Sequence, residues 1–407
     1  MKKTLIATAA LASLSAYAQS TVSITGVFDL GYRQVAAPFS TSTKGGMQNG
    51  TATSAILLQG EEDLGGGLKA NFRYEINPDL TAGAGLTGNV LASGTTSAMG
   101  TSGSTTYVKT SNGANGYNFL GVSGGFGGVK FGRLNTGTLA TWGIGSVFGT
   151  ALGSGYGTNG NIFTRDSSTV ANFNATAPTR YNNAVEYTTP AMNGLTGRIL
   201  YVPKVDGDGT GSTDSATATF PGVNRAGVTD VSLAYTSGQL NAGYSVQSHK
   251  YPTTLNHALV SPGASSAVVG GDYKLTTIAA NYKIGDLQLY VAQWSEVQQV
   301  VSSTAVKLDA TGNILGAKYA LNGNVDLMIN QGRRNDKSTT DSATAFSNRD
   351  QKILGLGADY KLSKRTALWA RYENKDPDTN RSGTSTLTTT ASNDATKTTA
   401  IGIRHTF

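Results

Sequence analysis

The 407-residue sequence has no cysteine, three histidines and nine prolines. Beyond its first eighteen residues it has no uninterrupted apolar run long enough for a transmembrane helix. The lack of cysteine excludes a disulfide framework, a thiolate metal site and a thiol nucleophile. No two histidines stand at a metal-ligand spacing. We therefore expect no metal, no cofactor and no enzyme activity.

Aromatic residues and glycines are plentiful for so polar a chain. The sequence has 18 Tyr, 12 Phe and 52 Gly, yet its mean hydropathy is −0.19. A membrane β-barrel has this combination because its strands show one face to lipid and the other to water, and the average conceals the apolar positions. A sequence rich in Gly, Ser and Thr also has two competing interpretations, a secreted β-helix and a disordered stalk.

The first eighteen residues have the features of a secretory signal peptide. Two lysines precede an apolar run over Leu5–Leu14, and Ala16-Tyr17-Ala18 fits a cleavage site. The run is too short to cross a bilayer as a helix, which argues against a membrane anchor. We expect residues 1–18 to be removed and residues 19–407 to form one domain. Loss of two lysines and no acid lowers the net charge from +7 to +5.

Apolar and polar residues alternate along many segments. In Leu68–Ile76, Lys69, Asn71, Arg73 and Glu75 alternate with apolar residues. Side chains alternate between the faces of a strand, so one face here is apolar and the other charged. A charged face cannot enter a dry core, but it can line a water-filled lumen. The same alternation occurs in residues 22–33, 231–236, 240–247, 354–362 and 401–407.

Short turns and long connections alternate along the chain. Seven short turns lie at residues 61–67, 124–128, 190–194, 236–239, 284–286, 321–324 and 363–365. With the two termini meeting as an eighth, they predict a 16-stranded antiparallel transmembrane β-barrel. The long connections cover roughly residues 77–116, 134–179, 203–229, 248–271 and 375–395. Short periplasmic turns and long extracellular loops are typical of outer-membrane barrels.

Three motifs resemble enzyme or ion sites but fit turns and loops better. The acids Glu61–Asp63 are consecutive in a turn and do not converge on one point, as acid/base catalysis requires. Gly124–Gly128 lacks the Lys-Ser/Thr ending of a phosphate loop. Asp206–Gly209 has no downstream Glu at the calcium-loop spacing. We expect all three to be solvated turns or loops.

The basic excess could indicate a nucleic-acid partner. However, the basic residues are spread along strands at lumen positions and are not interleaved with stacking aromatics. Positive charge in a narrow aqueous path between low-dielectric walls raises the local concentration of anions. A channel that favours anions therefore explains the charge better, and we expect no nucleic-acid partner.

Six segments resemble those of the Gram-negative general porins, most closely the trimeric porins of β-proteobacteria. They are residues 20–29, 60–69, 121–133, 180–183, 357–366 and 402–407. The resemblance implies a homotrimer in the cell outer membrane, each subunit with its own pore for small anions and hydrophilic solutes. It also implies contact with outer-membrane lipid and lipopolysaccharide, and insertion by the outer-membrane insertion machinery.

The resemblance further implies that the loop over residues 134–179 folds into the lumen and forms a constriction with an arginine cluster on the wall. Arg133 and Arg180 stand at two cluster positions, but Ala55 stands where a third arginine is usual. Lys69 and Arg73 on the adjoining strand are expected to compensate.

Two further residues complete the expected site. Asp166 is the loop's only acid and is expected to oppose the arginines, and Phe407 is expected to close the barrel and to contribute to its assembly signal. Two alternatives stay open: a substrate-specific channel for organic acids or sugars, and a barrel with an adhesive loop surface. The scattered tryptophans Trp142, Trp294 and Trp369 do not argue for a binding ladder.

Overall fold

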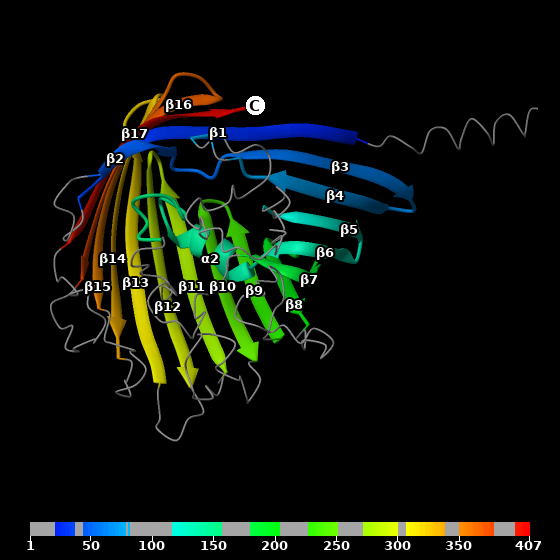
Figure 1. The fold of residues 1–407 in the computed structure, drawn as a ribbon. Coiled ribbons are helices and arrows are strands. Elements are labelled where there is room, and N and C mark those ends of the chain that lie inside the picture. Colours follow the sequence, from blue (N-terminus) through cyan, green and yellow to red (C-terminus); the bar gives the residue numbers. More distant parts are fainter. Residues whose placement is uncertain are drawn as a thin grey trace, which may run out of the picture.

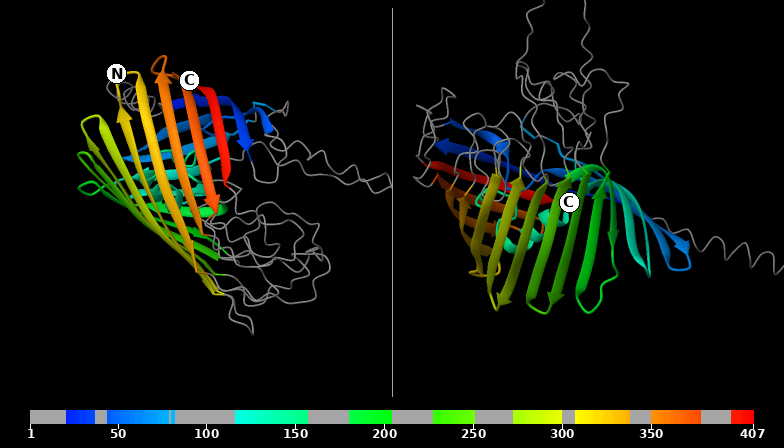
Figure 2. Two further views of the ribbon diagram at one scale, coloured as in Figure 1. Left: turned by 90° about the vertical axis from the view of Figure 1, so that its left-hand side faces the viewer. Right: turned by 90° about the horizontal axis from the view of Figure 1, so that it is seen from below.

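The protein is a closed 16-stranded antiparallel β-barrel in the computed structural model (Figures 1 and 2). The structure describes residues 21–36, 44–78, 80–81, 116–156, 180–203, 227–250, 272–299, 307–337, 350–377 and 395–407. The expected signal peptide and Asp166 therefore lie outside the described residues. Among the described helices, none has the length and hydropathy needed to cross a membrane.

Seventeen strand segments and one helix make up the described part of the chain. The first nine strands are β1 (Thr21–Ala36), β2 (Lys44–Asn49), β3 (Ala55–Gly65), β4 (Leu68–Ile76), β5 (Asn118–Gly124), β6 (Gly127–Asn135), β7 (Arg180–Thr188), β8 (Leu195–Val202) and β9 (Gly227–Ser237). The others are β10 (Leu240–Lys250), β11 (Tyr273–Ile284), β12 (Leu287–Gln299), β13 (Lys307–Ala320), β14 (Val325–Asp336), β15 (Gln351–Lys361), β16 (Thr366–Pro377) and β17 (Thr396–Thr406). The helix α2 (Gly137–Gly145) follows β6.

Seventeen segments make sixteen barrel strands because β2 and β3 are two halves of one strand. Both pair with β1: β2 with its second half and β3 with its first. The interruption surrounds Asp29, a fully buried residue of β1. Its carboxylate accepts hydrogen bonds from Thr51 Oγ1 at 2.8 Å and from the backbone N–H of Ala52 at 2.7 Å. These bonds replace the regular ladder over Gly50–Ser54.

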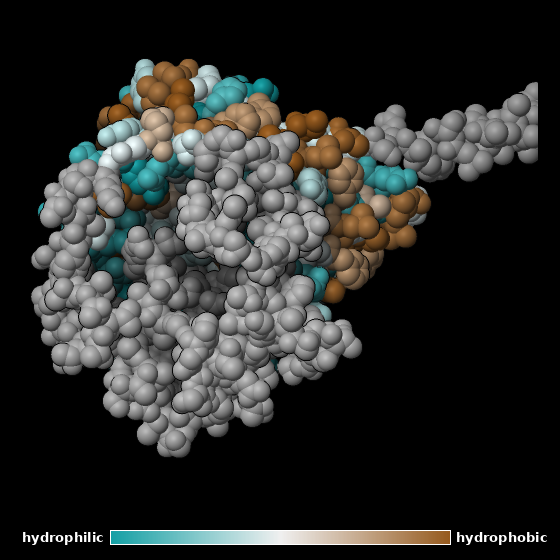
Figure 3. All heavy atoms as spheres, in the orientation of Figure 1, coloured by the Kyte–Doolittle hydropathy of each residue, from teal (hydrophilic) through white to brown (hydrophobic). Residues whose placement is uncertain are grey.

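The alternation in the sequence becomes an apolar outside and a polar inside. On β14, Leu327 and Ile329 are 42% and 48% exposed, whereas Asn330, Arg334 and Asp336 are buried. A strand in a soluble core would show the reverse, so the exposed apolar face is one that suits lipid. Figure 3 shows apolar residues gathered on the outer side of the strands at the right of the view.

The short turns lie where the sequence predicts them, and the largest change of a boundary is at residues 61–67. The acids Glu61–Asp63 belong to β3, which continues to Gly65. The turn itself needs Gly65, Gly66 and Gly67, whose φ angles are +82°, +62° and +80°. Such angles are unfavourable for residues with a Cβ, so the chain reverses at the glycines and not at the acids.

Several strands also extend further into the long connections than expected, because their pairing continues there. Strand β9 begins at Gly227, β10 ends at Lys250 and β16 ends at Pro377.

The chain after β6 enters the barrel. Helix α2 lies on the inner side of the sheet and contacts strands β8 to β13 (Figures 1 and 2). Trp142 of the helix is fully buried and meets Trp294 of β12 edge-on, with ring centroids 5.3 Å apart. Around this pair lies a small apolar cluster that includes Leu275 and Ile314. The inserted segment is thus packed against the wall from its first turn.

Candidate functional site

Two irregularities in β6 and β7 position Arg133 and Arg180. The register between these strands shifts around Arg133, where Gly132 has a φ of +145°, and Asn183 of β7 has a φ of +53°. Next to them, the Arg133 guanidinium donates to Asn182 Oδ1 at 2.7 Å, and Arg180 Nε donates to Asn135 Oδ1 at 2.6 Å. Each arginine is held by an asparagine of the other strand, which fixes the direction of both cations.

Glu75 brings Arg73 and Arg180 together. Its Oε2 lies 2.7 Å from Arg73 Nη2, and its Oε1 lies 3.8 Å from Arg180 Nη2. The carboxylate is buried, and Asn77 Nδ2 donates a further hydrogen bond to it at 3.0 Å. Arg133 is close enough to Arg180 to interact with it electrostatically. Three of the residues expected from the sequence are therefore neighbours.

A second acid extends the same wall. Glu186 of β7 pairs with Lys130 at 3.4 Å and with Arg198 of β8. Arg198 also donates to the backbone carbonyl of Asn135, the residue that binds Arg180. We call Arg73, Lys130, Arg133, Arg180 and Arg198 the basic cluster. With Glu75 and Glu186 it holds five positive and two negative charges, a net charge of +3.

Sequence reasoning placed Glu75 on the wall but did not assign it to the site, and it did not identify Glu186. The sequence contains a feature that could have pointed to each acid. Glu75 has the same strand parity as Arg73, and Glu186 follows the Arg-Tyr-Asn-Asn motif. Pairing across strands decides which cations they meet.

Lys69 does not join the basic cluster. It lies on β4 four residues before Arg73, about 13 Å away along the strand. Its ammonium group pairs with Glu61 of β3, and both side chains are about half exposed. The pair stands beside the turn at Gly65–Gly67, near the short-turn rim of the barrel.

The inserted segment is anchored at its start by Asp230 of β9. This fully buried carboxylate accepts hydrogen bonds from the backbone N–H of Gly137 at 2.8 Å and of Thr138 at 3.1 Å. It also accepts from Thr138 Oγ1 at 2.7 Å. A carboxylate at the first N–H groups of a helix both satisfies them and complements the helix dipole. At the other end of α2, Asn281 Nδ2 donates to the carbonyl of Ile144 at 2.8 Å.

A second anchor lies on the far wall. Glu373 of β16 accepts from the backbone N–H groups of Gly153 at 2.8 Å and Gly155 at 3.1 Å. Asn330 of β14 donates to the carbonyl of Gly153 at 3.0 Å, and Gly355 of β15 leaves room for that carbonyl because it has no side chain. The segment therefore runs across the lumen from β9 to β16.

The described part of the inserted segment carries no charged side chain between Leu134 and Tyr156. Burial raises the pKa of the Tyr156 hydroxyl to about 12, although nearby Arg180 opposes part of that rise. The hydroxyl is therefore neutral at physiological pH. Because Tyr156 interacts electrostatically with Arg180, the inserted segment comes near the basic cluster. Asp166, the acid expected to oppose the arginines, lies outside the described residues.

Phe407 lies at the seam between β17 and β1. Its backbone N–H donates to the carbonyl of Gly26, and the Gly26 N–H donates to the carbonyl of Phe407, both at 3.0 Å. The ring packs over Gly26, where a Cβ would collide with it, and lies 5.2 Å from the ring of Phe28. Strand β17 pairs with β1 along this seam. Among the described residues, no group of three His, Cys, Asp or Glu side chains is placed to hold a metal ion.

The comparisons with known proteins all point to porins. The Gram-negative porin family matches residues 4–380. Outer membrane porin protein 32 of Delftia acidovorans is 28% identical over 411 residues, covering 93% of this chain and 92% of that protein.

Solved structures match along nearly the whole chain. The anion-selective porin from Comamonas acidovorans matches with a TM-score of 0.66 and 20% identity, over 96% of this chain and all of that one. A trimer form of OmpT of Vibrio cholerae matches with a TM-score of 0.59 and 14% identity, over 95% of this chain and 99% of that one. The family match and the barrel agree: the chain belongs to the Gram-negative porin family and is an outer-membrane porin.

Proposed function

We propose that this porin is a passive, water-filled channel that prefers anions, with its constriction between the basic cluster and the inserted segment. The observation that carries the proposal is the charge imbalance between the two sides. The basic cluster has a net charge of +3, and the described inserted segment has no charge. A positive wall that faces a neutral one attracts anions and repels cations in a narrow path.

Arg133, Arg180 and Arg73 are the residues that would set this preference. Salt bridges with Glu75 partly neutralise Arg73 and Arg180, and Arg133 donates a hydrogen bond to the side-chain amide of Asn182. Asp166 would add one opposing charge to the inserted loop. Lys69 would contribute less, because it is paired with Glu61 near the short-turn rim.

Homotrimer formation also belongs to the proposal. A trimeric relative supports it, and β-barrels resist mild denaturation because their backbone hydrogen bonds are satisfied internally. In unheated detergent gels the protein should run as one large species that becomes a monomer on boiling. A monomer before heating would contradict the trimer.

The remaining parts of the proposal concern biogenesis and surroundings. Residues 1–18 would direct export and be removed, and the short turns would face the periplasm. Outer-membrane lipid and lipopolysaccharide would contact the exposed apolar face, and the insertion machinery would recognise the closing strand that ends at Phe407.

The decisive experiment measures the zero-current potential of the purified porin in a planar bilayer with a KCl gradient. An anion-selective channel sets this potential toward the equilibrium potential of chloride. Selectivity should weaken as salt rises, because the Debye length falls from about 10 Å at 0.1 M to about 3 Å at 1 M. A cation-selective potential at low salt would overturn the proposal.

A further inference from the structure

The first and last barrel strands meet at a closing seam between β1 and β17 (Figure 1). Trp369 of β16, Gly402 of β17 and Gly31 of β1 lie opposite one another in a single row across this seam. The two glycines leave room for the indole, because a Cβ at either position would collide with its ring. The Trp369 ring therefore lies over both strands of the seam.

The indole N–H reaches a carboxylate on the other side of the closing seam. Trp369 Nε1 donates to Asp29 Oδ1 at 2.7 Å, so the bond links β16 to β1 across β17. These two strands are two spacings apart, about 10 Å, which the length of the indole spans. Asp29 and Trp369 are 0% and 4% exposed. Burying a carboxylate is unfavourable unless its oxygens are hydrogen-bonded, so Asp29 depends on this donor.

The interruption between β2 and β3 holds Asp29 from the opposite side. Asp29 Oδ2 accepts from Thr51 Oγ1 at 2.8 Å and from the Ala52 N–H at 2.7 Å. The Asp29 carbonyl accepts from the Gly50 N–H at 2.8 Å, and a Cβ at Gly50 would collide with the carboxylate. The interruption thus supplies donors and space for a carboxylate that also needs the indole N–H.

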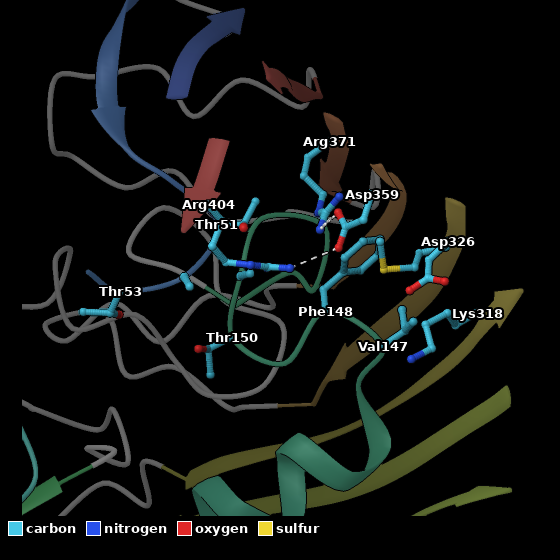
Figure 4. Close-up of a pocket in the computed structure, with 13 residues that line it drawn as sticks. Thr51, Thr53, Val147, Phe148, Thr150, Lys318, Asp326, Asp359, Arg371 and Arg404 are labelled. Atoms are coloured by element: carbon cyan, nitrogen blue, oxygen red, sulfur yellow. Dashed lines mark hydrogen bonds and ion pairs between the residues drawn. The ribbon is translucent and has the colours of Figure 1, made fainter. Parts of the chain in front are cut away.

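The same interruption shields the carboxylate from the lumen. Residues 51–53 line one side of a cavity between the barrel wall and the inserted segment, together with Arg371 and Arg404 (Figure 4). Asp29 is fully buried and does not line this cavity, although Arg371 interacts with it electrostatically. Water in the lumen can therefore replace the indole N–H as a donor only if the interruption moves.

The outer face of the closing seam has a separate contact. There the Phe407 ring packs over Gly26. Phe407 touches β1 at the end of β17, whereas Trp369 crosses the seam further along, at Gly31. Trp369 and Asp29 are 340 positions apart in the sequence, so they meet only when the two ends of the sheet meet. The inner contact is thus a product of closure and is lost when the seam opens.

We propose that Trp369 and Asp29 form an internal latch that keeps the closing seam from opening once the barrel has formed. The proposal goes beyond the channel function and is independent of ion selectivity. The latch forms when β16 and β17 reach β1, so it belongs to the last step of folding. Interactions that form after the transition state slow unfolding and leave the folding rate nearly unchanged. The latch therefore stabilises the closed barrel against unfolding from its seam.

Trp369→Phe tests the latch, because it keeps an aromatic ring over the two glycines and removes the donor to Asp29. The measurement is the rate at which the folded porin unfolds in hot SDS, from the loss of the folded band in gels run without boiling. The rate should rise at least about tenfold, because a hydrogen bond to a charged group is lost. The rate of refolding from urea into detergent should stay the same.

A disulfide shows whether the effect arises at the closing seam, since the chain has no cysteine of its own. Val27 and Thr406 lie opposite one another across the seam. The neighbouring pair, Gly26 and Phe407, exchanges two hydrogen bonds. Val27 and Thr406 are therefore a non-hydrogen-bonded pair, whose Cα atoms are about 4.5 Å apart and can be bridged. In oxidised Val27→Cys/Thr406→Cys, adding Trp369→Phe should no longer speed unfolding.

Lys283→Cys/Gln288→Cys is the matched control, because it places the same bond between β11 and β12, away from the seam. With this disulfide oxidised, Trp369→Phe should still unfold about tenfold faster. Thr51→Val removes another donor to Asp29 and keeps the side-chain shape, so it should also speed unfolding and provides the same test if Trp369→Phe does not fold. Wild-type unfolding kinetics in Trp369→Phe, or an effect that persists with the seam disulfide, overturns the latch.

Discussion

Asp230 and Thr138 are joined by two hydrogen bonds, one from the Thr138 backbone N–H at 3.1 Å and one from its hydroxyl at 2.7 Å. These two residues are 92 positions apart in the sequence. Their contact attaches the start of α2 to strand β9, and with it the inserted segment to the wall.

Asp230→Ala should loosen the inserted segment without unfolding the barrel. Loss of a helix N-cap costs on the order of 1 kcal/mol, and here three hydrogen bonds are lost together. Single-channel recordings should show larger and noisier conductance than the wild type. Thr138→Ser keeps a hydroxyl at the same place and should behave like the wild type. Unchanged conductance in Asp230→Ala would mean that the segment does not need this anchor.

Arg133→Glu with Arg180→Glu should reverse the selectivity of the channel. The substitutions change the local charge by four units, and screening at the Debye length of about 8 Å at physiological salt does not remove the field of groups this close to a passing ion. The zero-current potential in a KCl gradient should move strongly toward cations. Asp166→Asn removes a negative charge and should move it the other way. An unchanged potential in the double variant would show that these arginines do not govern the pore.

Arg73→Gln and Lys69→Gln form a matched pair on one strand. Each removes one positive charge from β4, but Arg73 belongs to the basic cluster and Lys69 pairs with Glu61 near the rim. Arg73→Gln should therefore shift the zero-current potential more than Lys69→Gln. Equal shifts would indicate that selectivity depends on total lumen charge rather than on position.

Deletion of Phe407 should sharply reduce the amount of porin in the outer membrane. The deletion removes two backbone hydrogen bonds to Gly26 and the ring contact with Phe28, so the seam between β1 and β17 loses its end. Export to the periplasm should continue, and fractionation with and without heating measures both steps. Phe407→Tyr retains the ring and should insert normally. Normal insertion of the deletion variant would exclude this role.

The alternation of residues by itself determined the strands and the barrel class. Leu68–Ile76 was expected from its parity and forms β4, and the seven turns contain Gly, Asn or Ser residues that tolerate tight reversals. Parity is a local property, because each side chain's face depends only on its place in the strand. The face of β4 on which Arg73 lies could therefore be predicted before any contact was known.

Tertiary structure decided which lumen residues meet. Glu75 binds Arg180 although the two are far apart in the sequence. The pairing depends on the irregular register around Gly132 and Asn183, which the spacing of residues in the sequence does not predict. The same holds for the interrupted second strand around Asp29 and for α2, whose place depends on Asp230. Strand register and bulges arise from contacts along the whole closed sheet, so a sequence read segment by segment specifies the faces but not the partners.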